Sequence, residues 1–281
     1  MENIHHPSLC MLGRSIALTR PWVMGIINVT PDSFSEHGAH FDFQRALTRA
    51  LTMIDDGADM IDIGGESSRP GASPVSEEEE LRRILPLTET LAKRGVYVSV
   101  DTVKPEVMRQ AALSGAAMIN DINALKTTGA LAAAQPHDVA VCLMHMRGEP
   151  KTMQRAPHYD DVVREVRADL SMRATVCENA GIARERIVLD PGFGFGKTME
   201  HNLALIRALP ELRTLNYPLL VGWSRKTTLG ILTGHDVGDR LAASIAAALA
   251  AVAQGALIVR VHDVRETVDA LKIWNAMTPN T

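Results

Sequence analysis

The chain has 281 residues, of which 46% are hydrophobic and 22% charged, and its formal net charge is −4 at pH 7. This composition is typical of a soluble globular protein, and the length is long for an ordinary domain but normal for an α/β barrel. The small negative charge and the lack of a basic block exclude the usual electrostatic footprint of a nucleic-acid-binding protein.

Cysteine usage and the N-terminus bear on the compartment. The three cysteines have no motif spacing, which indicates a reducing environment, and the first residues lack a signal-peptide pattern. Leu241–Ala253 is the most apolar helix-like run, and it is too short to span a bilayer. These features predict a cytoplasmic protein with no membrane partner.

Short apolar runs alternate with amphipathic runs along the whole chain. The predicted strands are Trp22–Asn28, Met60–Ile63, Val96–Val100, Ala117–Ile119, Val139–Leu143, Ile187–Leu189, Leu219–Val221 and Leu257–Val259. The predicted helices are Asp42–Asp56, one between Ser76 and Gly95, one that starts at Pro105, a poorly patterned one around Leu125–Ala134, Asp160–Asn179, one near Glu200–Leu209, Asp239–Gln254 and Val264–Met277.

This alternation predicts the fold. Strands separated by helices require right-handed crossovers and a parallel sheet. Eight such units favour a single (β/α)8 TIM barrel of the α/β class over an open doubly wound sheet. We expect residues 1–281 to form one domain, with residues 1–20 as an N-terminal extension that leads into the barrel. The active site should then lie at the carboxyl ends of the strands.

A polar residue stands at or near the end of each predicted strand. These residues are Asn28, Asp62, Asp101, Asn120, His145, Asp190, Ser224–Lys226, Arg260 and His262. Three of them follow a repeated Gly-Ala pattern at the same offset, in Gly57–Asp62, Gly115–Asn120 and Gly255–Arg260. Any barrel repeats its αβ turns, which explains the Gly-Ala pairs but not the polar residues. Converging carboxylates, an amide and a lysine suit a flat heterocycle, and the arginine and histidine suit a phosphate.

Three loops next to these strand ends have unusual compositions. Ile187–Lys197 is a buried strand ending in Asp190, followed by three glycines that alternate with two phenylalanines. It is neither a phosphate-binding P-loop nor a dinucleotide fingerprint, because Pro191 and Lys197 stand where those motifs need glycine. Asn28–Ser35 and Gly64–Ala72 mix glycine or proline with hydroxyl groups, as mobile lids do.

Eight separated segments together resemble dihydropteroate synthase of folate biosynthesis across essentially the whole chain. They are Asn28–Ser35, Asp62–Ala72, Ser99–Thr102, Ile119–Ile122, Leu143–Gln154, Leu189–Lys197, Gly222–Lys226 and Arg260–Val264. The resemblance implies a homodimeric transferase and sulfonamide target. Such an enzyme joins 6-hydroxymethyl-7,8-dihydropterin diphosphate to 4-aminobenzoate, releases diphosphate and uses Mg²⁺.

The resemblance also implies roles for individual residues. The pterin diphosphate would contact Ser68, Asp101, Asn120, Ile122, Met144, Asp190, Phe195, Gly222, Lys226, Arg260 and His262. The 4-aminobenzoate would contact Phe34, Arg69, Pro70, Phe195, Lys226 and Thr227, and Asn28 would hold the metal. Asp101, Asp190, Lys226 and Arg260 would be catalytic, since diphosphate loss leaves a pterin cation that the amine then attacks.

The sequence departs from the family pattern at a few positions. Ser68 stands where threonine is common, and Glu36-His37 follows the first lid. Trp223 is bulky enough to crowd the aminobenzoate end, unless it points outward.

Two rival functions remain open at this point. A barrel of the methyltetrahydrofolate methyltransferase type would share the pterin carboxylate and amide, but it would not need Ser224–Lys226 or Arg260–His262. A catalytically silent pterin-binding barrel would not need the lid and diphosphate residues. Formation of dihydropteroate from both substrates and Mg²⁺ would distinguish the synthase from both rivals.

Overall fold

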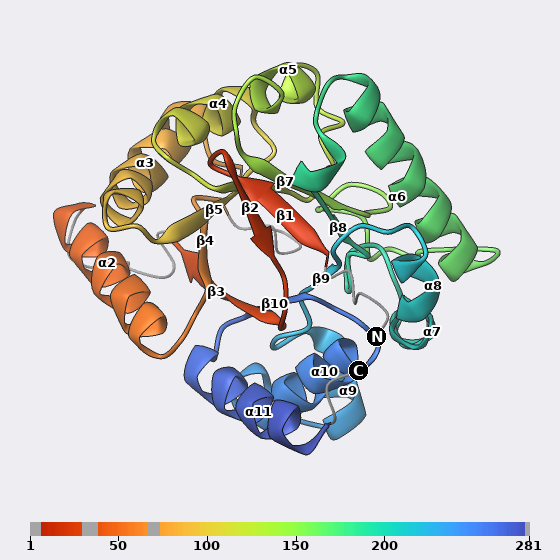
Figure 1. Cartoon of the computed structure of the whole chain (residues 1–281). Helices are drawn as coiled ribbons and strands as arrows, with labels where there is room; N and C mark the ends of the chain where they lie inside the picture. Colours follow the sequence, from red (N-terminus) through yellow and green to blue (C-terminus); the bar gives the residue numbers. More distant parts are fainter. Residues whose placement is uncertain (1–6, 30–38, 67–73, 279–281) are drawn as a thin grey trace, which may run out of the picture.

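A computed structural model describes residues 7–29, 39–66 and 74–278 of the chain. Its strands form a central ring that helices surround (Figure 1). The barrel strands are β3 (Trp22–Asn28), β4 (Met60–Gly64), β5 (Tyr97–Asp101), β6 (Met118–Asp121), β7 (Ala140–Met144), β8 (Ile187–Asp190), β9 (Leu220–Val221) and β10 (Ile258–Val261). They form one eight-stranded sheet in the order β8-β7-β6-β5-β4-β3-β10-β9. A parallel bridge between Leu189 and Leu219 links its two ends, so the predicted barrel is confirmed.

The helices on the outside cover every side of this ring (Figure 1). They are α2 (Ala39–Asp55), α3 (Glu77–Lys93), α4 (Pro105–Leu113), α5 (Ala130–Ala134), α6 (Val162–Asn179), α7 (Met199–Arg207), α8 (Leu209–Arg213), α9 (Thr227–Thr233), α10 (Leu241–Ala253) and α11 (Val264–Met277). Short 3₁₀ turns lie at Arg184–Arg186 and Val237–Asp239. Among the described helices, none is long and apolar enough to cross a membrane.

The prediction of a helix around Leu125–Ala134 is wrong at its start. The two carboxylate oxygens of Asp121 accept hydrogen bonds from the backbone N–H groups of Asn123 and Leu125, each at 2.7 Å. These bonds hold a tight turn, and α5 begins only at Ala130, after Gly129 with φ of 90°. A carboxylate that bonds local backbone in this way competes with helix formation.

Further differences from the prediction concern three helical regions. The helix near Glu200–Leu209 is two helices, α7 and α8, which meet at Ala208. The helix expected from Asp239 begins at Leu241, because a 3₁₀ turn precedes it, and α9 is an additional helix between the seventh and eighth strands.

The N-terminal extension forms an antiparallel hairpin of β1 (Ser8–Met11) and β2 (Arg14–Ala17), which lies across the ring in Figure 1. Leu9, Met11 and Leu18 are fully buried in a cluster with the side chains that begin the barrel strands, among them Trp22 and Ile258. The hairpin therefore closes the end of the barrel where the strands start. The opposite end, where the strands finish, is left for a site.

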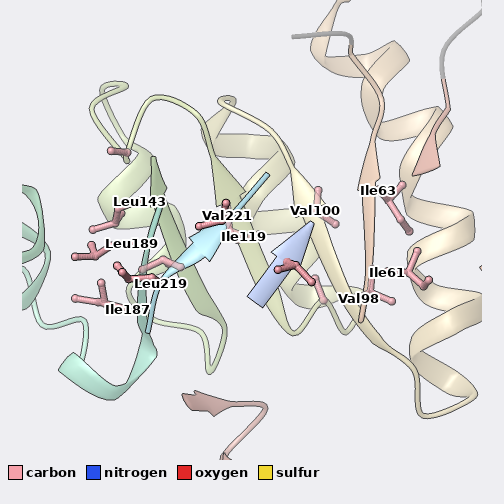
Figure 2. Packing of buried hydrophobic residues seen from close by; sticks show 14 of the residues in the cluster. Ile61, Ile63, Val98, Val100, Ile119, Leu143, Ile187, Leu189, Leu219 and Val221 are labelled. Carbon is pink, nitrogen blue, oxygen red and sulfur yellow. The ribbon is translucent and has the colours of Figure 1, made fainter. Parts of the chain in front are cut away.

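Successive strand residues face opposite sides of the sheet, and this alternation divides the molecule into two cores. Outward residues such as Ile61, Ile63 and Val100 pack against the helices in one large cluster (Figure 2). The inward residues in the first half of the strands, such as Met24 and Met60, form the second cluster. Further along, the inward positions include the polar residues Asp62, Ser99, Asn120 and Arg260. The period of two therefore gathers the polar strand ends inside the barrel mouth.

Candidate active site

Arg260, on β10, lies between two carboxylates inside the barrel. Its Nε donates to Asp62 Oδ2 at 2.6 Å, and its Nη2 donates to Asp101 Oδ2 at 2.9 Å. Asn120 Nδ2 also donates to Asp62 Oδ2, at 3.3 Å. Burial alone would lower the pKa of Arg260, but the carboxylates of Asp62 and Asp101 outweigh it and raise the pKa. The guanidinium therefore stays charged and its plane is fixed by two partners.

Asp101 has an unusual protonation equilibrium. Burial raises its pKa to about 7, Arg260 opposes the shift, and the carboxylates of Asp62, Asp121 and Glu80 add to it. Asp101 therefore holds a proton more readily than an exposed carboxyl does. It can either donate a hydrogen bond to a ligand or present a negative charge to one.

Asp190 and Lys226 form the second charged pair of the mouth. Asp190 Oδ1 accepts a hydrogen bond from Gly192 N at 2.7 Å, which leaves its other oxygen as the principal acceptor for a ligand. Burial raises the pKa of Asp190 although Lys226 opposes this. Burial likewise lowers the pKa of Lys226 to about 8, against the pull of Asp190. The lysine donates to the carbonyl oxygen of Phe193 and lies 4.7 Å from the ring centroid of Phe195.

Two polar atoms inside the barrel have no hydrogen-bond partner among the described residues. They are Asp62 Oδ1 and Ser99 Oγ, and both are buried. Asp62 and Ser99 are register partners on β4 and β5, so the two groups are neighbours. Buried polar atoms rarely lack a partner in native proteins, and a polar ligand or ordered water accounts for them.

The glycine loop after β8 is shaped by a close approach to the chain after β7. A Cβ atom at Gly192 would collide with the carbonyl oxygen of His145, and one at Gly196 would collide with that of Arg147. Both glycines also have positive φ, of 67° and 62°. Only glycine satisfies both conditions, so the alternation of glycines with phenylalanines has a steric reason. It buries Phe193 and leaves the other ring, that of Phe195, half-buried.

Trp223 does not crowd the mouth, because it points outward from the barrel and is buried there. It is 4% exposed, and its ring centroid lies 4.7 Å from that of Phe193 in the core outside the barrel. The next residue back, Gly222, faces Arg260, with 3.8 Å between an added Cβ and the arginine Cβ. Trp223 belongs to the cluster of outward-facing side chains that pack against the helices. Of the two alternatives that the sequence left open for Trp223, the outward orientation is therefore confirmed.

The structure brings most of the predicted site residues to the mouth. Five of them lie at the inward-facing end of a strand or just after it, namely Asp101, Asn120, Asp190, Lys226 and Arg260. Met144 is the register partner of Asp190, and Ile122 is buried just after β6. Gly222 and Phe195 lie beside Arg260 and Lys226, as described above. His262 contacts Ser224, with 3.0 Å between Nδ1 and Oγ, and Thr227 is exposed where α9 begins. Asn28 is the register partner of Gly64.

Other predicted positions lie elsewhere. Phe34, Ser68, Arg69 and Pro70, with Glu36-His37 and most of both lid segments, lie outside the described residues. His145 does not serve the mouth, contrary to its predicted place there. It is buried, with Nδ1 2.9 Å from Lys197 Nζ, and burial lowers its pKa to about 2.

Asp62 is the residue whose importance the sequence reasoning missed, since it was placed at the mouth but given no role. It is fully buried and contacts both Arg260 and Asn120. A signal was present, because Asp62, Asn120 and Arg260 are the three residues at the same offset of the repeated Gly-Ala pattern.

Within the described ranges there is no group of three or more His, Cys, Asp or Glu residues that could hold a metal ion. Asn28 offers one neutral oxygen, and an added Cβ at Gly64 would lie 3.5 Å from it. Mg²⁺ commonly binds through one or two protein oxygens, with substrate phosphates and water completing its shell. The residues present therefore fit a metal carried largely by a diphosphate substrate.

Known proteins resemble this chain in both sequence and structure. A family model described as pterin binding enzyme matches residues 24–262. A dihydropteroate synthase of Escherichia coli strain K12 is 53% identical over 265 residues, which cover 94% of each chain. The Yersinia pestis dihydropteroate synthase in complex with a sulfonamide drug superposes with a TM-score of 0.91 at 49% identity, covering 96% of this chain and 98% of that one. The Xanthomonas albilineans enzyme with 4-aminobenzoic acid gives 0.91 at 50% identity, with 98% and 100% covered.

Proposed function

The chain belongs to the family of pterin-binding enzymes, and we propose that its barrel mouth carries out the dihydropteroate synthase reaction. The protein is a transferase that condenses a dihydropterin diphosphate with 4-aminobenzoate. The observation that carries the proposal is the Asp62–Arg260–Asp101 arrangement, set beside Asp190 and Lys226 at the strand ends. It combines acceptors for an amino-pyrimidinone with cations for a leaving anion. A methyltransferase of the methyltetrahydrofolate type would need only the acceptors for the amino-pyrimidinone.

The pterin ring would bind deepest in the mouth. Asp190 has one oxygen on the Gly192 N–H, so its other oxygen would accept from the amino-pyrimidinone edge. Asn120 and Lys226 would serve the remaining ring atoms, with Ile122, Met144 and Gly222 as the pocket wall. We add Asp62 to this set because its Oδ1 is buried without a partner among the described residues. Arg260, held flat by two carboxylates, would lie against the ring face.

The chemical step begins when the bond between the pterin methylene carbon and the diphosphate oxygen breaks. The diphosphate leaves with the electron pair, and the methylene becomes a cation delocalised into the ring. Asp101 in its ionised form, with Asp190, would favour this cation, while Arg260 and His262 would receive the leaving diphosphate. Mg²⁺, held by Asn28 and the substrate, would neutralise charge on the diphosphate. The amine of 4-aminobenzoate then forms the new carbon–nitrogen bond and loses a proton.

The 4-aminobenzoate would lie at the outer part of the mouth, against the half-buried ring of Phe195 and the stem of Lys226. Thr227 at the start of α9 would meet its carboxylate, with Phe34, Arg69, Pro70 and Ser68 as further proposed contacts from the two lid segments. The Xanthomonas relative holds 4-aminobenzoic acid, and the Yersinia relative holds a sulfonamide. We propose that sulfonamides compete with 4-aminobenzoate at this subsite.

We also propose that the protein is a homodimer joined through α9 and α10. Large apolar side chains are exposed on this face, with Ile231 61% and Leu232 53% exposed. The exposed stripe of α10 continues the face with alanines such as Ala246, and the helix contains no charged residue. An uncharged surface of this kind marks an interface. Ala246→Glu should give a monomer in light scattering, whereas Met172→Glu, at an exposed apolar position on α6, should leave the mass unchanged.

The remaining assignments are also proposals. Residues 1–281 would act as one pterin-binding domain, with the hairpin of the N-terminal extension as the floor of the barrel. The three cysteines are free thiols, which supports the proposed cytoplasmic location.

The deciding experiment is incubation of the protein with 6-hydroxymethyl-7,8-dihydropterin diphosphate, 4-aminobenzoate and Mg²⁺. We expect equal amounts of dihydropteroate and diphosphate. Pterin binding without product would instead support a silent barrel. Absence of both binding and product would overturn the proposed function.

A further inference from the structure

Side chains hold every carbonyl group of the glycine loop from Gly192 to Gly196. Lys197 Nζ donates to the carbonyl oxygens of Gly192 at 2.9 Å and Phe195 at 3.0 Å. The carbonyls between and after them bind Lys226, Gln154 and Tyr159, in chain order Phe193, Gly194 and Gly196. Three glycines give the loop large conformational freedom, and these five side-chain contacts help to hold it in one conformation.

Lys197 makes two of these contacts and is the most deeply placed of the donors. It is 3% exposed, and its Nζ also lies 2.9 Å from His145 Nδ1 and 3.3 Å from the His145 carbonyl oxygen. Within the described chain, its recorded hydrogen bonds all end on neutral acceptors. Since His145 is neutral, its Nδ1 accepts from Lys197 Nζ, and the ring proton is on Nε2.

A buried lysine without a carboxylate partner is a costly choice. Burial lowers the pKa of Lys197, which measures the penalty on its charged form. An apolar residue would avoid this penalty. The lysine nevertheless contacts two segments at once, the glycine loop and the chain that follows β7 through His145. Packing alone therefore does not explain a lysine at this position.

The other side of the glycine loop carries the ring of Phe195 and faces Lys226, both of which the proposed function assigns to 4-aminobenzoate. The residue whose carbonyl Lys197 holds, Phe195, places its ring 4.7 Å from Lys226 Nζ. An added Cβ at Gly194 would lie 3.2 Å from Lys226 Cδ, so the loop also runs along the stem of that lysine. Releasing the peptide plane of Phe195 would move both the ring and the neighbouring ammonium.

We propose that Lys197 is a positioning residue that sets the 4-aminobenzoate subsite by holding the Gly192 and Phe195 carbonyl groups against His145. It does so from behind the loop, without contact to either substrate. This inference rests on the proposed function, because it needs Phe195 and Lys226 to face 4-aminobenzoate. Small displacements of groups that orient a substrate have large kinetic effects.

The test compares Lys197→Met with Lys93→Met as the matched control. Lys93 is a surface lysine in the last turn of α3, paired with Glu89 at 2.7 Å, so the control removes the same group away from the loop. For Lys197→Met we expect the KM for 4-aminobenzoate to rise about tenfold or more, and the Kd for pterin diphosphate to stay within about twofold. Lys197→Gln, which keeps two donors, should recover part of the loss. The control should match the wild type.

Several outcomes would overturn the inference. An unchanged KM for 4-aminobenzoate in a folded Lys197→Met would overturn it. An equal rise in the KM for 4-aminobenzoate and the Kd for pterin diphosphate would also overturn it, because an equal rise indicates a general loss of structure. If Lys197→Met does not fold, His145→Phe decides, because it keeps a ring but removes the acceptor nitrogen. It should raise the KM for 4-aminobenzoate selectively, about threefold, and no selective rise would count against the inference. A wild-type protein that forms no dihydropteroate would instead overturn the proposed function itself.

Discussion

The guanidinium of Arg260 and the carboxylate of Asp62 are 2.6 Å apart, Nε to Oδ2, although 198 residues separate them in the chain. They stand on β10 and β4, which flank β3 on its two sides. Asp62 is fully buried, so the arginine neutralises a charge that the fold has taken out of water. The same arginine contacts Asp101, and through it the two carboxylates share one cation.

Arg260→Lys should therefore lower turnover strongly. Lysine keeps the charge but cannot hold two carboxylates in a plane while presenting a face to the pterin. We expect turnover to fall by roughly 10²–10³, the loss typical when a preorganised charge-stabilising donor is removed. Arg20→Lys, at the surface pair with Asp59, is the control. A wild-type rate in Arg260→Lys would remove Arg260 from the mechanism.

Asp190→Asn should weaken pterin binding. The Gly192 N–H occupies one oxygen of Asp190, so the amide oxygen of the variant would stay there and its NH₂ would face the donors of the pterin edge. The expected loss is roughly 2–4 kcal/mol of binding free energy, as for a mispaired buried polar group. Calorimetry with the pterin diphosphate measures it, with Asp160→Asn at an exposed site as the control. Equal affinities would contradict the assignment.

The fall of kcat/KM at alkaline pH should depend on the loss of the proton from Lys226. Burial lowers its pKa to about 8, so the ammonium loses its proton above that pH and can no longer act as a cation beside Asp190. We expect kcat/KM to fall by about tenfold per pH unit well above pH 8. Lys226→Arg stays charged, so whatever its activity, its pH profile should lack this fall. A fall that persists in the variant would assign the titration to another group.

The stability of the protein should depend on Asp101 in slightly acid solution. Burial raises its pKa from 3.8 to about 7, so the folded state retains a proton that the unfolded chain releases between these values. Stability then falls as pH rises through this window, by up to about 1.4 kcal/mol per pH unit.

Asp101→Asn removes this titration, so it should gain stability relative to the wild type as pH rises toward 7. Urea unfolding at several pH values measures the difference, and Asp269→Asn, at a surface ion pair, controls for the substitution. Parallel pH curves for Asp101→Asn and the wild type would show that Asp101 does not titrate in this range.

The sequence by itself determined the barrel and the position of the polar residues along it. Alternating strand and helix patterns depend on local periodicity, and a repeated αβ turn delivers a polar residue at three of the strand ends, as in Gly57–Asp62 and Gly255–Arg260. The residue types at those ends, together with the family resemblance, were enough to indicate a pterin enzyme. They did not give Asp62 a role, they placed the side chain of His145 at the mouth, and they left the orientation of Trp223 open.

Only the tertiary structure decided which of these side chains meet. Whether a strand-end residue faces the mouth depends on the pleat of its strand, which turns Gly222 inward and Trp223 outward. The partners of Arg260 are on strands that are far from it in the chain. Lys197 contacts two segments, because the glycine loop and the chain after β7 approach until only glycine fits between them. Such contacts depend on closure of the barrel, and no local pattern in the chain encodes them.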